Sequence, residues 1–261
     1  MIRLVLNSAV LVIFLSHNSN CRTGWTPHEL VTAESKITFI YEVNYVVSLE
    51  YRKHFVCTGA LVSRKHIITA AHCIEKYGQP RHFIARLGSS RIQKEGQTFK
   101  VQRAFVHPKY GQTPSTHEYD YNIAIVSLRD SVRCENSCGV VPLMPDNQEI
   151  VDGAAMLVAG WGTQYNQFDG QLRILYVPKI AEGTCFENYL HFGGITTQMI
   201  CAGSDARDAC RGDDGGPLVS NNQLVGVLSF GHSCGHPRYP EVYTLIGSPT
   251  IRSWIKSKIN I

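Results

Sequence analysis

Three segments of the chain carry side chains that are suited to acid–base or nucleophilic chemistry. His72 stands in segment 69–73 (TAAHC), Asn122 directly precedes an apolar run, and Asp214 stands in segment 212–217 (GDDGGP). Histidine is the usual general base near neutral pH. A carboxylate that is already ionised has no proton to give and attacks a peptide carbonyl poorly. The three segments therefore offer a base without a hydroxyl for it to activate.

These segments resemble the active-site segments of the trypsin-type serine proteases. That family carries its catalytic histidine in a Thr-Ala-Ala-His-Cys motif, an aspartate directly before Ile-Ala, and its nucleophile in Gly-Asp-Ser-Gly-Gly-Pro. The chain keeps the histidine as His72, but has Asn122 for the aspartate and Asp214 for the serine. Further matches are AGWG at 159–162, MICAG at 199–203, LSFG at 228–231 and PEVYT at 240–244. The resemblance covers most of the chain from about Tyr45 to the end.

The resemblance implies an all-β fold of two six-stranded antiparallel β-barrels with a C-terminal α-helix. A chain of 261 residues is long enough for one all-β domain of the larger kind. Clusters of Gly, Pro, Asn and Ser separate short β-rich runs. These runs are 45–50, 55–62, 99–106, 155–159, 171–177 and 223–229. Ser248 and Pro249 predict the start of a final helix, in which apolar residues recur at helical spacing up to Ile259.

The N-terminus predicts export from the cell. Arg3 is followed by an apolar run over 4–15 and polar residues over 16–20, as in a secretory signal peptide. A membrane anchor is the alternative, but spanning a bilayer takes about 20 apolar residues. We expect a signal peptide over 1–20, an N-terminal extension over 21–36 and a protease-like domain over 37–261. The net charge of +4 falls to +3 without Arg3, which is too mild to indicate nucleic acid.

Nine cysteines in an exported chain predict disulfide bonds. The resemblance implies three pairs, namely Cys57 with Cys73, Cys185 with Cys201, and Cys210 with Cys234. The other three cysteines leave two alternatives open. Either Cys134 bonds Cys138 across a tight loop, or one of them bonds Cys21.

The histidine and cysteine spacings do not favour a metal site. His232 and His236 flank Cys234, but they lack the spacing of a zinc motif. No nearby histidine or cysteine completes tetrahedral ligation at the Cys-x-x-x-Cys segment. We therefore expect neither a metal nor a cofactor.

The resemblance also implies a substrate pocket with Asp208 at its floor and Ser229 and Gly231 along its walls. Asp208 alone would favour basic substrates. Glu241 stands where the family usually has a glycine, and we expect the pocket to be either occluded by its side chain or neutralised, for instance by Arg238 or Arg211. The alternative is an outward-rotated Glu241 on a remodelled loop.

The carboxylates around the catalytic position raise separate expectations. In the family, the amides of Gly212 and Asp214 would form the oxyanion hole. The Asp214 carboxylate either lies across His72, which would raise the pKa of His72, or points to solvent. Asp120 lies about 6 to 7 Å from the position of Asn122, which is too far for it to replace the missing aspartate. In the family, Asp213 pairs with a terminus released at Ile-Val-Gly-Gly, a sequence that this chain lacks.

These observations predict a secreted, non-catalytic serine protease homologue. It would act as a binding or regulatory module in an extracellular proteolytic cascade, with an extracellular protein, a protease or its substrate, as partner. We expect neither a nucleic-acid nor a membrane partner. The rival hypothesis is an active endopeptidase with an unorthodox site, in which His72 and Asp214 activate water. A lectin-like or metal-binding module has no feature of the sequence in its favour.

Overall fold

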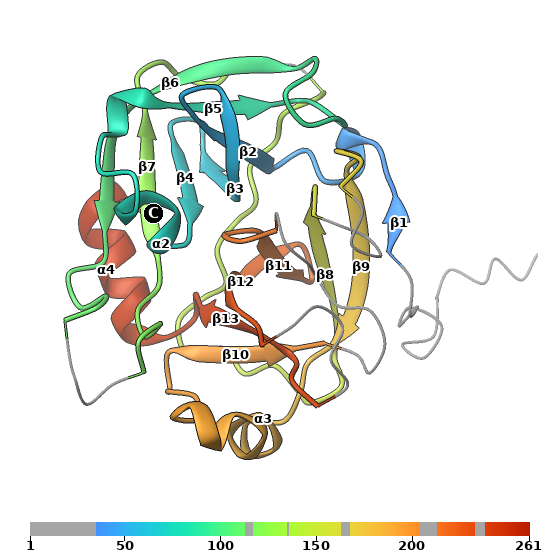
Figure 1. Ribbon diagram of the computed structural model, residues 1–261, viewed down its shortest axis with the longest axis vertical. Helices are drawn as coiled ribbons and strands as arrows, with labels where there is room; N and C mark the ends of the chain where they lie inside the picture. Colours follow the sequence, from blue (N-terminus) through green and yellow to red (C-terminus); the bar gives the residue numbers. More distant parts are fainter. Residues whose placement is uncertain (1–34, 113–116, 135, 163–167, 204–212, 233–237) are drawn as a thin grey trace, which may run out of the picture.

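The computed structural model describes residues 35–112, 117–134, 136–162, 168–203, 213–232 and 238–261, and shows a mostly β molecule (Figure 1). Six strands form a closed barrel in the order β2-β3-β4-β7-β6-β5, and every neighbouring pair is antiparallel. The strands are β2 (Val46–Tyr51), β3 (His54–Ser63), β4 (His66–Thr69), β5 (Phe83–Leu87), β6 (Gln97–Val106) and β7 (Ala124–Leu128).

The second half of the chain forms a seven-stranded antiparallel sheet in the order β1-β9-β8-β11-β12-β13-β10. Its strands are β1 (Lys36–Ile37), β8 (Ala155–Gly160), β9 (Arg173–Pro178), β10 (Met199–Ala202), β11 (Pro217–Ser220), β12 (Gln223–Phe230) and β13 (Glu241–Leu245). β9 and β10 meet only at one end, through a bridge between Lys179 and Ala202. The expected second barrel is thus a sheet of six strands curled toward closure, with β1 added at one edge.

The C-terminal helix forms as expected and packs on the first barrel. α4 (Pro249–Ile259) starts with a proline. Proline is common at the first position of a helix, because the N–H that it lacks has no partner within the helix there. The helix buries Ile251, Trp254 and Ile255 in the same core as the barrel strands. The other helices are α2 (His72–Glu75), α3 (Glu182–Tyr189) and the short 3₁₀ turns η1 (Ile40–Glu42), η2 (Pro80–His82) and η3 (Leu190–Phe192). In the described parts of the chain, no helix is both long and apolar enough to cross a membrane.

Aliphatic side chains of β4 and β7 fix the part of the first barrel that leads to the candidate site. Ile67, Ile68 and Ile125 are fully buried in the largest core cluster. Burying each such side chain contributes about 1.5–3 kcal/mol. This packing holds the ends of β4 and β7 rigidly beside each other.

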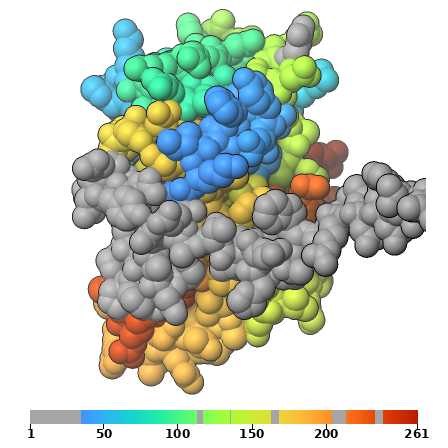
Figure 2. All heavy atoms as spheres, turned by 90° about the vertical axis from the view of Figure 1, so that its right-hand side faces the viewer, coloured from blue at the N-terminus to red at the C-terminus, as the bar shows by residue number. Residues whose placement is uncertain are grey.

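The N-terminal part of the described chain lies on the outside of the molecule. Figure 2 shows this segment, in blue, against the yellow segment that contains β9. The backbone N–H of Thr38 donates to the carbonyl of Leu172 at 2.9 Å, which extends the contact beyond β1. Phe39 and Tyr41 are more than half exposed there.

Candidate functional site

Two neighbouring strands of the first barrel bring His72 and Asn122 together. β4 ends at Thr69, and His72 opens α2 three residues later, while Asn122 stands two residues before β7. Thr69 pairs with Ala124 in the ladder between β4 and β7. The disulfide between Cys57 and Cys73 ties α2 to β3 and fixes the backbone beside His72.

Hydrogen bonds on both sides of its amide fix the orientation of the Asn122 side chain. Its Oδ1 accepts a hydrogen bond from the backbone N–H of His72 at 3.1 Å. Its Nδ2 lies 2.9 Å from Nδ1 of His72 and donates to Oγ of Ser229 at 2.8 Å. A backbone N–H can only donate, so rotating the amide by 180° would place two donors against each other. Nδ2 therefore faces the imidazole as a donor.

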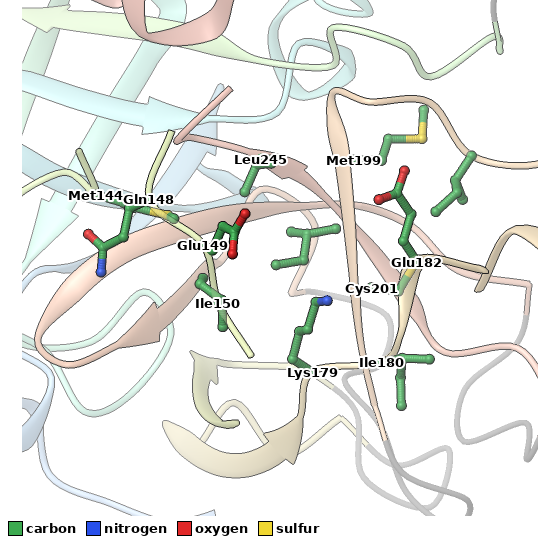
Figure 3. A pocket seen from close by; sticks show the side chains of 12 residues that line it. Met144, Gln148, Glu149, Ile150, Lys179, Ile180, Glu182, Met199, Cys201 and Leu245 are labelled. Atoms are coloured by element: carbon green, nitrogen blue, oxygen red, sulfur yellow. The ribbon is translucent and has the colours of Figure 1, made fainter. Parts of the chain in front are cut away.

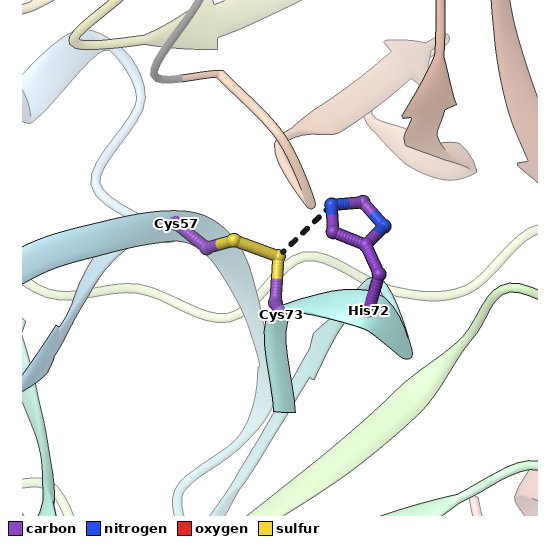
Figure 4. Close-up of side chains that lie close together, drawn as sticks. All are labelled: Cys57, His72 and Cys73. Atoms are coloured by element: carbon purple, nitrogen blue, oxygen red, sulfur yellow. Dashed lines mark hydrogen bonds between the residues drawn. A yellow bond between two sulfur atoms is a disulfide. The ribbon is translucent and has the colours of Figure 1, made fainter. Parts of the chain in front are cut away.

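This arrangement selects the tautomer of His72. Because Nδ1 accepts from Asn122, the proton of the neutral ring resides on Nε2. Nε2 lies 3.6 Å from Sγ of Cys73 (Figure 4). This sulfur is in a disulfide, so it can accept a hydrogen bond but has no proton for His72 to remove. In the serine protease triad, by contrast, Nδ1–H donates to a carboxylate and Nε2 is the free base.

Cys57, His72 and Cys73 are the one group of potential metal ligands within the described residues. Both cysteines are in a disulfide with each other, so neither offers a thiolate. This group therefore does not have the chemistry of a zinc site.

The pKa of His72 is lowered, and the raised pKa that pairing with Asp214 would give is not found. Burial is the main cause, and it outweighs the Asp214 carboxylate and the Asn122 hydrogen bond, which raise the pKa. None of the ion pairs in the described chain joins His72 to Asp214. Asp214 therefore acts on His72 only through its field, and the neutral imidazole prevails.

A glycine holds the turn at Asp214 against the first barrel. Gly215 has φ +76°, and a Cβ there would lie 2.1 Å from Oγ1 of Thr69 and 2.5 Å from the carbonyl oxygen of Thr58. The backbone N–H of Thr58 donates to the carbonyl of Asp214 at 2.8 Å. The position that would carry a nucleophile is thus fixed beside β3 and β4 by backbone contacts.

The other two carboxylates of this region have different environments. Oδ1 of Asp213 accepts from the backbone N–H of Gly162 at 2.9 Å, and the carboxylate lies tightly against Gly160. Asp120 is buried, and its Oδ1 accepts from Oγ1 of Thr196 at 2.7 Å. Asp120 is therefore directed to the second half of the molecule and not to His72.

Glu241 lies against Gly231, one of the two wall residues of the expected pocket that the structure describes. Its side chain is buried, with 6% of the residue exposed. A Cβ added to Gly231 would lie 2.0 Å from Oε2 of Glu241, so the carboxylate lies directly on this wall. Ser229, the other wall residue, is buried and bound to Asn122. Asp208, Arg211 and Gly212 lie outside the described residues.

The three disulfides in the described chain are Cys57–Cys73, Cys185–Cys201 and Cys134–Cys138. The first two are pairs that the resemblance implies, and the third decides between the two alternatives for the Cys-x-x-x-Cys loop. Cys21, Cys210 and Cys234 lie outside the described residues.

Aromatic rings next to His72 form a feature that the sequence did not suggest. Tyr119 meets the ring of His72 edge-on, with centroids 6.5 Å apart. Phe230 stacks with Tyr119 at 4.9 Å and with His117 at 4.7 Å, and Tyr189 meets it edge-on. We call these four residues, His117, Tyr119, Tyr189 and Phe230, the aromatic stack. They come from segments some 40 to 110 residues apart, so no local pattern reveals them.

A separate hollow of about 360 Å³ lies on the second sheet near β10, β13 and the start of α3. Apolar side chains line much of it, and Glu149, Lys179 and Glu182 point into it (Figure 3). Lys179 is paired with Asp152. The hollow shares no residue with the surroundings of His72.

A comparison with known families decides the family of this chain. The model of the trypsin family matches residues 36–255. The chain belongs to the trypsin family. It is 38% identical to trypsin 5G1 of Aedes aegypti over 223 residues, which cover 83% of this chain and 80% of that protein. It is 36% identical to the vitellin-degrading protease of Bombyx mori, over 84% of this chain and 82% of that protein.

A solved structure supports the same assignment. The structure of neuropsin, a serine protease expressed in the limbic system of mouse brain, matches with a TM-score of 0.76 at 30% identity. The match covers 87% of this chain and 99% of neuropsin.

Proposed function

We propose that this member of the trypsin family is a catalytically inactive homologue. It is exported from the cell and acts as a binding or regulatory module in extracellular proteolysis. The observation that carries the proposal is the hydrogen bond from Nδ2 of Asn122 to Nδ1 of His72. It leaves the proton on Nε2, the nitrogen that a serine protease uses as its base.

The wrong tautomer is one of two losses at this site, and their costs do not simply add, because triad residues act as a unit. In this family, asparagine in place of the triad aspartate lowers turnover by about 10⁴ through the wrong tautomer. Loss of the nucleophile is larger, about 10⁶ in a well-studied serine protease. Asp214 has no hydroxyl proton for a base to remove, so the covalent acyl-enzyme of the family has no starting point.

Substrate placement supports the same proposal. The buried Glu241 carboxylate lies where the family accommodates the side chain next to the scissile bond. Within the aromatic stack, Tyr119 and Phe230 are only half-buried. They offer a bound polypeptide a firm surface beside His72, because aromatic rings bury much area at little entropic cost. Three disulfides in the described chain are typical of exported proteins.

The proposal is tested by the tautomer of His72, which ¹⁵N NMR of the imidazole distinguishes. We expect the neutral ring to be protonated on Nε2 and to have a pKa below the ordinary value near 6.5. Asn122→Asp should move the proton to Nδ1 and raise the pKa. Asp214→Asn is the matched control, because it removes a charge near His72 but leaves the tautomer unchanged. A native ring protonated on Nδ1 would contradict the proposal.

The binding role is tested by capture from native extracellular fluid. Immobilised protein should retain a protease or a protease substrate, and Tyr119→Ala with Phe230→Ala should release it because the aromatic stack is lost. Asp214→Asn serves as the control with an intact stack. Retention of the same proteins by the stack variant would argue against the cleft as the binding surface.

A further inference from the structure

Positive charge is concentrated in three segments of the first barrel. Segments 63–66, 100–103 and 127–138 contain six cations and two carboxylates, Asp130 and Glu135, which gives them a formal charge of +4. The whole chain carries only +4, so the rest of the molecule is close to neutral. The six cations are Arg64, Lys65, Lys100, Arg103, Arg129 and Arg133, and we call them the basic face.

The fold brings the three segments together. In the barrel, β7 lies between β4 and β6, and Ser127 pairs with His66 on one side and Arg103 on the other. Neighbouring strands lie about 4.8 Å apart. Backbone hydrogen bonds extend the contacts beyond the strands. They run from Leu128 to Lys65 at 2.8 Å, from Arg129 to Lys100 at 2.9 Å and from Val132 to Arg64 at 2.7 Å.

The charges of the basic face are exposed and little neutralised. All six residues are exposed to solvent. Their one ion pair in the described chain joins Arg129 to Asp130 at 3.9 Å, with both side chains more than 60% exposed. A pair of this kind contributes little and is screened by salt. The face therefore keeps a positive potential that attracts anions.

The basic face also contains a hollow. Arg64 and Arg133 line a cavity of about 560 Å³ together with Leu61, Val132 and the Cys134–Cys138 disulfide. A guanidinium group binds oxyanions with two parallel hydrogen bonds. The apolar floor between the arginines suits the face of a sugar ring whose charged groups reach the rim.

We propose that the basic face binds a sulfated polysaccharide. An extended polyanion matches cations that are spread over three neighbouring segments, and a sulfated sugar chain is the polyanion that suits an exported protein. The inference rests on the export part of the proposed function, but not on the loss of catalysis. The basic face adjoins the start of β4, and His72 follows the end of β4. The two ends of this strand are about 10 Å apart.

The test uses the full secreted chain and a heparin oligosaccharide of defined length, with affinity measured over a series of NaCl concentrations. Binding should weaken steeply with salt, because each cation engaged releases counterions. We expect the triple variant Lys65→Gln, Lys100→Gln and Arg129→Gln to lower affinity by about 10- to 100-fold. The slope of log K against log [NaCl] should become shallower by about two to three.

Matched variants separate a specific site from general charge. Lys53→Gln, Lys76→Gln and Lys94→Gln together remove the same charge from other exposed positions and should leave affinity unchanged within about twofold. Lys65→Arg, Lys100→Arg and Arg129→Lys together keep the charge and should retain binding. Desulfated heparin should not bind the native chain.

Several results would overturn the proposal. The first is that the native chain does not bind heparin. The second is that the two triple Gln variants, the one on the basic face and the control, lose affinity equally. Equally tight binding of double-stranded DNA or of phosphatidylserine vesicles, lost in the same variant, would also overturn it, because the face would then not select sulfated sugars. Turnover that depends on His72, together with heparin binding through this face, would contradict only the inactive-homologue proposal.

Discussion

At the scale of single residues, the replacement of a carboxylate by an amide reverses the direction of one hydrogen bond. Asn122 lies at the place from which an aspartate would accept the Nδ1 proton of His72, but its orientation is set by the backbone N–H of His72. The ring is thus held as firmly as in an enzyme, with the proton on the other nitrogen. The proposed loss of acid–base chemistry therefore requires no displacement of the ring.

This separation predicts that restoring the triad alone will return little activity. Asp214→Ser with Asn122→Asp should give only feeble turnover of Arg and Lys substrates, because the buried Glu241 carboxylate against Gly231 would still obstruct the proposed pocket. Misplacing the scissile bond by about 1 Å can cost on the order of 10² in rate. Adding Glu241→Gly should increase kcat/KM at least about tenfold, measured with small ester and amide substrates.

Glu241→Gln is the control for this prediction, because it keeps the volume of the side chain and should not restore activity. Trypsin-like turnover by the double variant would show that the pocket argument is wrong. The same result would leave Asn122 and Asp214 as the only barriers to catalysis.

At the scale of elements, a buried histidine joins the end of β6 to the C-terminal helix. The ring of His107 stacks on Tyr121 at 4.7 Å and contacts Trp254 of α4 at 4.9 Å. Burial, with help from the charge of Lys109, lowers its pKa to about 4. The ring is therefore neutral in the folded protein and takes up a proton more readily in the unfolded one.

This lowered pKa predicts a pH dependence of stability. Below pH 6.5 the unfolded chain binds the extra proton, so stability falls as the pH drops toward 4. We expect the free energy of unfolding by urea to lose roughly 1 to 3 kcal/mol from this residue between pH 6.5 and 4. His107→Phe should remove that part of the pH dependence, and an unchanged pH profile in the variant would refute the assignment.

The elements differ in how well the sequence predicted them. β2, β3, β6, β8, β9 and β12 lie within about two residues of the expected runs, because their β-rich segments are bounded by turn residues. α3 was not predicted, since Glu182–Tyr189 has little apolar periodicity and is held by packing of Cys185 and Tyr189. β1 spans two residues and exists only through its pairing with β9.

The candidate site was predictable in composition but not in geometry. His72, Asn122 and Asp214 were located by motif, and the amide of Asn122 had two permitted orientations. A contact across 50 residues, to the backbone N–H of His72, selects one of them. The motif left open whether Asp214 pairs with His72 and raises its pKa, because the burial of the ring depends on packing, which the motif does not encode.

At the scale of the whole molecule, disulfides tie secondary-structure elements to one another. Cys57–Cys73 joins β3 to α2, and Cys185–Cys201 joins α3 to β10. Each closes a loop of about 16 residues, for which the unfolded chain loses roughly 3 kcal/mol of conformational freedom. These bonds suit an exported protein that must persist without chaperones.

We predict that peptide mapping without reduction will find these two pairs, Cys134–Cys138, and Cys210–Cys234. Cys21 is the ninth cysteine and should be outside all four pairs, either as a free thiol or bonded to another molecule. Alkylation before digestion distinguishes these two forms. A bond from Cys21 to Cys134 or Cys138 would contradict the pairing of the tight loop.

The claim that joins all three scales is that this trypsin-family fold has kept its architecture without its catalysis. The most direct measurement is turnover of protein and peptide substrates with basic, aromatic and small side chains, comparing the purified native chain with His72→Ala. The account predicts no hydrolysis above background in either protein, because His72 holds its proton on Nε2 and Asp214 is no nucleophile. Hydrolysis by the native chain that disappears in His72→Ala would contradict it, and would point instead to water activated by His72 and Asp214.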